Sequence, residues 1–370
     1  MNDVVRAFQR GRDLVTGQPF AVLLWLVAAL LLVDLFGDLL SGQLPVYQFA
    51  TYVLDGLTVG LVIGLAGVGL SMTYSILNFA NFAHGDYITA GAFAGWAVTY
   101  VVAGFGTEAL DNLVLVGAGN SVYASDLGIN VLATPLAIVL GIVFAGLATI
   151  ALSLVVDRYV FKPLRKEEGI ILLITSVGVA LALRYLIVFV FQQNSRGVTA
   201  DVPRFTVPVV DGTINVSYHQ VTLIVVAIAL MVGIHVVLQR TKLGKAMRAM
   251  ADNKDLALIT GIPTERVVRW TWILGGGLTG VAGYLIILER GTLSYNFGWL
   301  LLLLIFAAVI LGGIGSVYGA IGGGIIIGLA SRVSLVWLPE ATFARPAAFF
   351  VMILILVYRP QGLFSGRATA

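Results

Sequence analysis

The 370-residue sequence contains no cysteine. Disulfide bonds, thiol nucleophiles and cysteine-ligated metals are therefore excluded from its chemistry. The three histidines, His84, His219 and His235, are too scattered for the ligand spacing of a metal-binding motif. We therefore expect that this chain holds no metal ion.

Charged residues are also scarce. They make up 11% of the chain, against roughly 25% in a typical soluble domain. Hydrophobic residues make up 59%, and the mean hydropathy is +0.98. The composition indicates a polytopic membrane protein. The formal charge of +3 does not indicate a nucleic-acid partner, because the basic residues concentrate in short segments of the kind that set membrane orientation.

Three kinds of chemical motif are missing as well. The sequence contains no HExxH zinc-protease motif and no GxxxxGK[ST] phosphate loop. It offers no pair of carboxylates inside the apolar segments, as aspartyl chemistry or an ion relay would require. We therefore expect no catalytic residues and no cofactor bound by this chain, so any ATP must be hydrolysed by another chain. Nor do we expect a cleavable signal peptide, because Met1–Gln18 is polar.

Ten segments are apolar enough to be considered as membrane spans, for which about 20 such residues are needed. The short Trp299–Gly313 segment is compatible with a half-helix, so we predict an all-α transmembrane bundle of eight to ten spans. The ten segments are Phe20–Phe36, Leu54–Leu77, Tyr87–Phe105, Leu132–Val156, Ile170–Gln192, Val221–Leu238, Trp270–Leu288, Trp299–Gly313, Tyr318–Val336 and Ala344–Tyr358.

Basic residues predict the orientation of these spans. With ten spans, every strongly basic segment falls on one side of the membrane, which the positive-inside rule assigns to the cytosol together with both termini. The opposite loop, Gly106–Val131, contains acidic residues and no Lys or Arg. The basic segments are the N-terminal tail (Arg6, Arg10, Arg12), the loop Asp157–Glu168, the segment Gln239–Arg269 and the C-terminal tail (Arg359, Arg367).

Glycine is abundant, with 43 residues, and much of it recurs at every fourth position. In lipid this spacing lets helix backbones approach one another closely, so we predict helix packing at these glycines. A phosphate-binding role for Gly312–Gly324 is less favoured, because no strand is expected before it. The spaced glycines are Gly56, Gly60 and Gly64, then Gly315, Gly319 and Gly323, and finally Gly324 and Gly328.

The polar segment Gln239–Arg269 is the longest charged interruption of the apolar chain. Its periodicity predicts one short amphipathic helix over Leu243–Ala251. A second helix is predicted over Lys254–Thr260, started by a cap at Asp252 or Asn253 and ended by Gly261. Two short helices on a membrane face would form a platform for another protein. The alternative is a solvated connector that only follows the charge rule.

A second polar run, Asn78–Asp86, lies between two apolar segments. Its residues Asn78, Asn81, His84 and Asp86 predict either a hydrated translocation path or gate, or a broken helix inside the protein. The alternative is a tight cytosolic turn in which Asn81 and Asp86 cap helix ends.

Arg184 is the one charge well inside an apolar segment, and we group it with the path or gate. We find no Asp or Glu at a matching depth in any predicted span. The alternative for Arg184 is therefore a structural role, in which it pairs with backbone carbonyls or extends to the membrane surface.

Four motifs resemble those of LivH-type permeases of branched-chain amino acid ABC importers, within the wider family of hydrophobic amino acid uptake permeases. The resemblance covers about residues 54–364, so we expect a permease domain over 54–366 and a separate tail with one apolar span over 1–53. The motifs are LSMTYSILNFANFAHGD at Leu70–Asp86, LGKAMRAMADNKDLALITG at Leu243–Gly261, AAVILGGIGSVYGAIGG at Ala307–Gly323 and RPQGLF at Arg359–Phe364.

Within the second motif, Asp255-Leu256-Ala257-x3-Gly261 is similar to the EAA-x3-G element that such permeases present to their ATPase. It departs from that element by having Asp-Leu in place of Glu-Ala. The resemblance implies that Lys254, Asp255, Leu256, Ala257 and Gly261 form the ATPase-coupling loop.

The resemblance also implies partners and a function. The partners would be a second, LivM-like permease, two cytosolic ABC ATPases, an extracytoplasmic solute-binding protein and the lipid bilayer of a prokaryotic cell membrane. The chain is expected to be a multi-pass membrane protein that translocates a small amino acid, most simply a branched-chain one. Alternatives are a permease for urea or short amides, a self-contained secondary transporter and, third, a passive channel.

Overall fold

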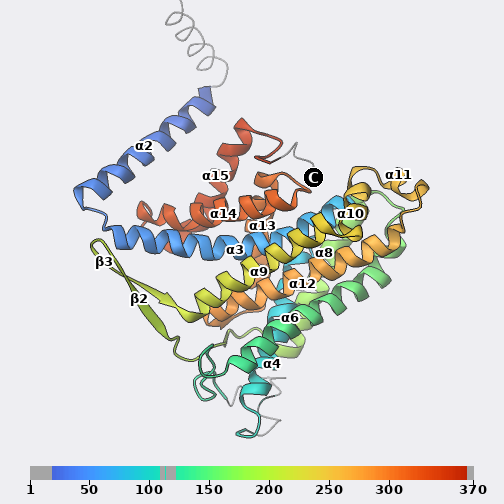
Figure 1. Ribbon diagram of the computed structural model, residues 1–370, viewed down its shortest axis with the longest axis horizontal. Coiled ribbons are helices and arrows are strands. Elements are labelled where there is room, and N and C mark those ends of the chain that lie inside the picture. The colour runs from blue at the N-terminus through green and yellow to red at the C-terminus, as the bar shows by residue number, and fades with distance from the viewer. Residues whose placement is uncertain (1–18, 109–112, 114–121, 365–370) are drawn as a thin grey trace, which may run out of the picture.

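The computed structural model describes residues 19–108, 113 and 122–364 (Figure 1). Several residues on which the predicted orientation depends, Arg6, Arg10, Arg12, Asp111 and Arg367, lie outside the described residues. The helices are α2 (Pro19–Ser41), α3 (Val46–Leu77), α4 (His84–Ala103), α6 (Pro135–Val156), α7 (Lys162–Leu164), α8 (Gly169–Phe191), α9 (Tyr218–Arg240), α10 (Lys242–Asp252), α11 (Lys254–Ile259), α12 (Thr264–Arg290), α13 (Phe297–Gly312), α14 (Val317–Val333) and α15 (Ala344–Tyr358).

Each of the ten predicted apolar segments lies mainly within one of these helices. Among the described residues, seven helical segments are long and apolar enough to cross a membrane, so the chain is a multi-pass membrane protein. This count is below the predicted eight to ten. α13 has only 16 residues, as its short apolar segment predicted, and the 20-residue α4 begins with the polar residues His84 and Asp86.

Helix α3 lies at the centre of the bundle. Its 32 residues extend over roughly 48 Å at 1.5 Å per residue, and α12, α14, α13 and α9 all pack along it (Figure 1). α2 lies outside this core beside α15, and the indole of Trp337 donates a hydrogen bond to the Asp34 carboxylate at 2.9 Å. Residues 58–73 of α3 are buried almost throughout, as expected for a helix surrounded by protein rather than lipid.

The predicted glycine packing is confirmed where α3 crosses α14. A methyl group added at Gly60 would lie 2.9 Å from the Gly324 carbonyl oxygen, and one added at Gly324 would lie 2.5 Å from the Gly64 Cα. Gly56 faces Gly328 in the same way. The two backbones therefore touch, and larger side chains at these positions would force the helices apart.

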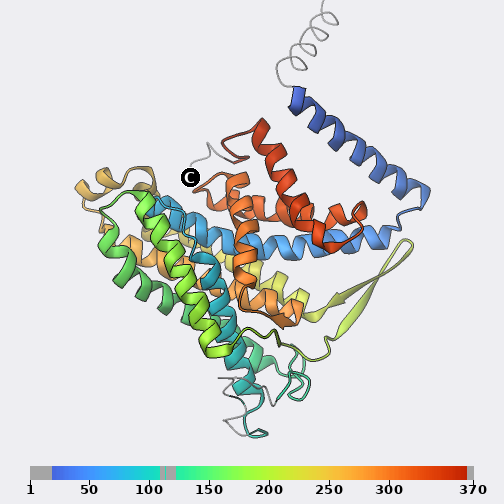
Figure 2. The same cartoon turned by 180° about the vertical axis from the view of Figure 1, so that it is seen from behind.

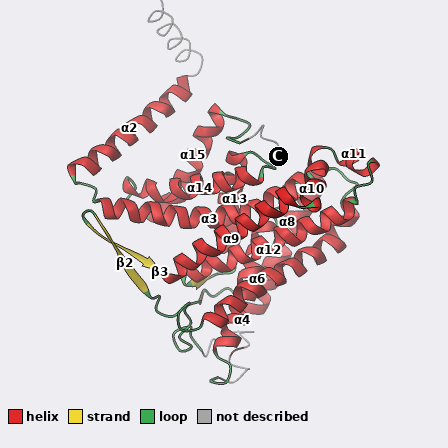
Figure 3. Ribbon diagram, in the orientation of Figure 1, coloured by secondary structure: helices red, strands yellow, loops and turns green. Residues whose placement is uncertain are grey.

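The loop after α8 contains strands that the all-α prediction missed. β2 (Arg204–Val209) pairs antiparallel with β3 (Gly212–Ser217), and β1 (Arg196–Gly197) pairs with β4 (Thr292–Leu293) (Figure 3). The Asp211 carboxylate at the tip of the hairpin accepts hydrogen bonds from the first backbone N–H groups of α3, including Tyr47 at 2.9 Å. The hairpin therefore caps the start of the central helix.

The hairpin and the platform helices α10 and α11 lie at opposite ends of the molecule (Figure 1). They flank α9, whose 23 residues separate them by roughly 34 Å. The connector η1 (Asp157–Phe161), a π-helical turn, and α7 lie at the platform end, since Lys162 contacts Glu265 of α12 at 2.9 Å. Two of the predicted basic segments are thus at the same end of the protein.

Candidate functional site

Helix α10 is fixed firmly to the end of α9. The Thr241 hydroxyl caps it by accepting a hydrogen bond from the Gly244 backbone N–H at 3.1 Å. Gly244 packs so closely on the Leu238 backbone that it has no room for a side chain, and the Arg248 guanidinium donates to the Leu238 carbonyl at 2.6 Å. α10 confirms the helix predicted over Leu243–Ala251, and these contacts join it to the end of α9.

Helix α11 confirms the second predicted helix, and of the two predicted caps Asn253 is the one used. Its side-chain oxygen accepts a hydrogen bond from the Leu256 N–H at 2.9 Å. Gly261 follows the helix with a φ of +83°, as predicted for its end. Only Ala257 is buried, whereas the apolar side chains of Leu256, Leu258 and Ile259 are 53%, 59% and 80% exposed. This polar segment therefore presents an apolar surface that nothing in the described chain covers.

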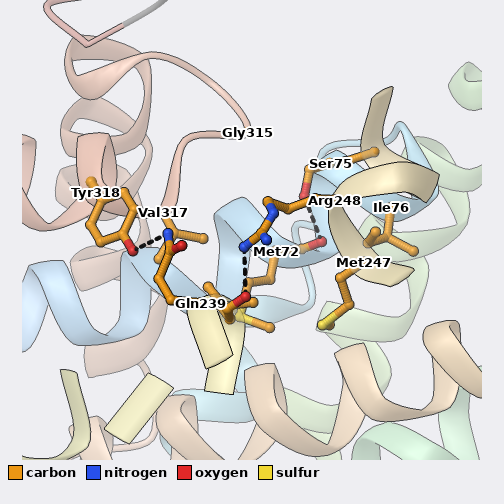
Figure 4. A pocket seen from close by; sticks show the side chains of 11 residues that line it. Met72, Ser75, Ile76, Gln239, Met247, Arg248, Gly315, Val317 and Tyr318 are labelled. Carbon is orange, nitrogen blue, oxygen red and sulfur yellow. Dashed lines mark hydrogen bonds between the residues drawn. The ribbon is translucent and has the colours of Figure 1, made fainter. Parts of the chain in front are cut away.

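A small pocket of about 30 Å³ marks the place where α10 meets the ends of three other helices (Figure 4). The Gln239 amide donates to the Tyr318 hydroxyl at 3.0 Å, and the His235 ring lies 2.8 Å from the same oxygen. These two contacts join the end of α9 to the start of α14, and α10 lines the same pocket with the end of α3 and the α13–α14 turn. The pocket therefore brings together three of the motifs found in the sequence. The pocket is lined by Met72, Ser75, Ile76, Leu238, Gln239, Met247, Arg248, Ala251, Gly315, Val317 and Tyr318.

The second polar run breaks the helical path inside the bundle. Asn78 ends α3 in the left-handed conformation, with a φ of +55°, and the chain stays non-helical until Ala83. The Ser176 hydroxyl of α8 accepts the Phe82 N–H at 3.0 Å and lies 3.4 Å from the Ala80 carbonyl oxygen. Ser176 is seven residues past the start of α8, or roughly 10 Å along that helix. The break therefore lies at membrane depth, where only protein groups or water can satisfy its backbone.

Asn81 and His84 are both buried beside this break. The Asn81 side-chain oxygen accepts the Ala83 N–H at 3.1 Å and so closes the turn before α4, but no side chain caps that helix, and the alternative in which Asn81 caps a helix end is wrong. The His84 Nε2 lies 2.9 Å from the Ala66 carbonyl oxygen and 3.4 Å from the Thr279 hydroxyl. These contacts tie α4 to α3 and α12. That Asn78, Asn81 and His84 border a translocation path remains a prediction.

The prediction that Arg184 lacks an acidic partner is wrong. Its guanidinium donates two hydrogen bonds to the Asp86 carboxylate, at 3.1 and 2.9 Å, and Asp86 is completely buried. The same guanidinium lies 4.7 Å from the centre of the Trp299 ring. The helix break carries the start of α4 into the bundle, so Asp86 reaches the level of Arg184 instead of lying in a surface turn. α4 and α8, teal and green in Figure 2, consequently run side by side.

Several residues of this interior site were not predicted from the sequence. Charges inside membrane spans usually pair with one another. Asp86, directly before the apolar segment Tyr87–Phe105, was therefore the signal in the sequence for a partner of Arg184. Nothing comparable distinguishes Ser176, Trp299 or Thr279 from the many other small or aromatic residues of the spans.

Known proteins resemble this chain over most of its length. BraD of Pseudomonas aeruginosa, a permease protein of a high-affinity branched-chain amino acid transport system, is 26% identical over 321 residues, which cover 86% of this chain and 96% of BraD. LivH of Escherichia coli K12, described in the same terms, is 26% identical over 321 residues, covering 85% of this chain and 95% of LivH. A probable LivH of Methanocaldococcus jannaschii is 29% identical over 314 residues, covering 81% and 87%.

No solved structure matches this chain. The family model described as the permease component of branched-chain amino acid transport systems matches residues 52–358. That range includes the helix break, the Arg184–Asp86 pair and the platform formed by α10 and α11. The chain therefore belongs to the family of branched-chain amino acid transport permease components.

Proposed function

We propose that this chain is the permease subunit of an ATP-driven importer that carries a branched-chain amino acid across the prokaryotic inner membrane. Its partners would be a second, LivM-like permease, two cytosolic ABC ATPases that bind the ATP, and an extracytoplasmic binding protein that delivers the solute. The family match and the names of the relatives support this assignment.

The observation that carries the proposal is the exposed apolar surface of α11. Leu256, Leu258 and Ile259 project from a segment too polar to enter lipid, and exposed apolar groups rimmed by polar residues mark protein contacts. In the proposed orientation both termini and this platform lie in the cytosol. The basic connector Asp157–Glu168 lies at the same end, which supports this orientation.

The contacts around α10 give a route for coupling. Closure of the ATPases would move α11 and α10. α10 would pass that movement to α9 through Gly244 and Arg248, and α9 would pass it on to α14 through Gln239 and Tyr318. Because α10 is joined to several helix ends, one rigid displacement biases the spans between inward-open and outward-open arrangements.

The interior break would act as the gate in this mechanism. The Asp86–Arg184 pair holds the start of α4 against α8, while His84 holds it against α3 and α12. A change in the tilt of α8 would therefore reposition Asn78 and Asn81 with it. Asp86 is a carboxylate deep in the bundle, but its two bonds to Arg184 leave it poorly suited to bind a coupling ion. This geometry favours the importer over a self-contained secondary transporter.

A double variant tests the docking role of α11. We expect Leu256→Arg with Ile259→Arg to abolish co-purification of the ATPases, since both changes place charge on the proposed apolar contact. The matched control is Val210→Arg, which places charge on a 91% exposed residue of the hairpin at the other end. Unchanged co-purification and unchanged stimulation of ATP hydrolysis in the α11 variant would refute the assignment.

A further inference from the structure

An apolar groove of about 450 Å³ runs along the outside of the bundle between α6, α9 and α12. α6 contributes Val143, Leu147 and Ile150, and α12 contributes Ile273 and Gly277. Nearly every group that lines the groove is aliphatic, and Val143 and Leu147 are about half exposed. In a bilayer such a groove is filled by hydrocarbon.

A basic pocket of about 570 Å³ lies at the platform end, where η1 and α7 meet the start of α12. Its charged residues are four cations and two carboxylates. Arg165 binds both Asp157 and Glu265, and Lys162 also binds Glu265. Within the described part of the chain, the two remaining cations, Arg158 and Arg269, form no ion pair, and both are exposed. The pocket therefore has two positive charges available for an anion.

The groove leads into the pocket. On α6 and its π-helical extension, Ile150 lines the groove, and Leu154 and Arg158, at successive steps of four residues, line the pocket. On α12, Ile273 lines the groove, and Arg269, four residues before it, lines the pocket. Each step advances roughly 6 Å along a helix, so Arg269 stands about one turn beyond the groove and Arg158 about two turns beyond it.

Exposed aromatic residues show where this junction lies relative to the bilayer. Tyr159 is 70% exposed next to Arg158, and Trp270 is 40% exposed next to Arg269. Tyr and Trp are enriched at the boundary between hydrocarbon and head groups. The cations of the pocket are therefore at head-group level, with the groove extending into the hydrocarbon.

We propose that the groove and the basic pocket together bind one anionic phospholipid, with its phosphate between Arg158 and Arg269 and an acyl chain between α6, α9 and α12. An acidic segment of a protein partner would match the cations but not the aliphatic groove below them, and a lipid matches both. In the orientation of the proposed function this lipid belongs to the cytosolic leaflet. The leaflet rests on that proposal, whereas the lipid site rests only on the groove and the pocket.

The test measures lipid retained by the full-length chain after extraction from nanodiscs that contain phosphatidylglycerol and phosphatidylcholine, read by native mass spectrometry. Because each juxtamembrane cation contributes roughly five-fold to anionic lipid binding, we expect Arg158→Gln with Arg269→Gln to weaken retention of phosphatidylglycerol roughly thirty-fold. The control, Lys166→Gln with Arg266→Gln, removes two exposed cations that do not line the pocket and should retain the lipid.

A second pair of variants tests the groove. Gly233 lines it, and a Cβ added there meets nothing within 4 Å, so we expect Gly233→Leu to extend into the groove and displace the acyl chain. Gly178→Leu on α8 adds the same bulk in equally open space outside the groove and should change nothing.

Each other outcome overturns the proposal. Equal retention in the pocket and control variants would show only non-specific attraction to the basic surface. In a separate co-purification of the same variants, loss of the ATPases without loss of lipid would assign the pocket to a protein contact. Since the readout needs neither ATPase nor solute, it stays interpretable if the proposed transport function fails.

Discussion

The interior break at residues 78–83 and the platform at residues 241–261 are both polar interruptions of helices, but their surroundings differ. In each, an asparagine side-chain oxygen accepts a nearby backbone N–H: Asn81 closes the turn before α4, and Asn253 caps α11. In the break, Ser176 and the Asp86–Arg184 pair supply partners from within the chain. In the platform, Leu256 and Ile259 are exposed. The polar groups of the break are thus bonded within this chain, whereas the platform leaves apolar side chains exposed, as the proposed contact with the ATPases requires.

The largest expected effect comes from breaking the interior ion pair. Asp86→Asn leaves the mostly buried Arg184 without its counter-charge, which costs about 3–5 kcal/mol of folding free energy. We expect a marked fall in the thermal unfolding temperature of the purified chain, with no partner needed to see it. Replacing both residues, as Asp86→Leu with Arg184→Met, should recover most of the loss. A single variant as stable as the wild type would show that the pair does not hold α4 to α8.

A smaller effect is expected at the hydroxyl that satisfies the break. Ser176→Ala removes the acceptor for the Phe82 N–H and leaves that group unsatisfied, at a cost of about 1–3 kcal/mol. Thr175→Ala on the neighbouring residue of α8 is the control. Equal unfolding temperatures for the two variants would mean that water or another group satisfies the backbone there.

The smallest effect on stability is expected at the platform, where, unlike in the break, a mutation should change partner binding and not the unfolding temperature. Asn253→Ala removes the cap of α11 and weakens that helix by about 1 kcal/mol without changing the unfolding temperature of the bundle. We expect an affinity for the ATPases lowered by a few fold, while Asn253→Ser, which also caps, restores it. A lower unfolding temperature with unchanged ATPase affinity would show that α11 stabilises this chain and does not bind the ATPases.

The platform was predictable because its signals are local. The amphipathic period, a cap at Asp252 or Asn253 and the end of the helix at Gly261 each follow from a few adjacent residues. The glycine contacts between α3 and α14 were likewise visible as a four-residue spacing in both segments. These patterns require no knowledge of how the spans are arranged.

The interior site depended on information that is not local. Hydropathy placed Asp86 outside a span, because it treats each apolar segment as one straight crossing. Only the packed structure shows that residues 78–83 descend along α8, which brings Asp86 to Arg184. The β2–β3 hairpin was not predicted because its two six-residue strands lack the long apolar runs that indicate membrane spans. The Asp211-Gly212 pair between β-branched residues was its available signal.

Uptake by reconstituted vesicles tests directly whether this chain needs the ATPases to move solute. Labelled leucine is supplied with the binding protein to vesicles that contain this chain alone, or this chain with the second permease and the two ATPases. We expect accumulation against a gradient only in the complete assembly, only with ATP on the platform side, and not when Leu256 and Ile259 are replaced by arginine. Accumulation by this chain alone, with no ATPase present, would contradict it.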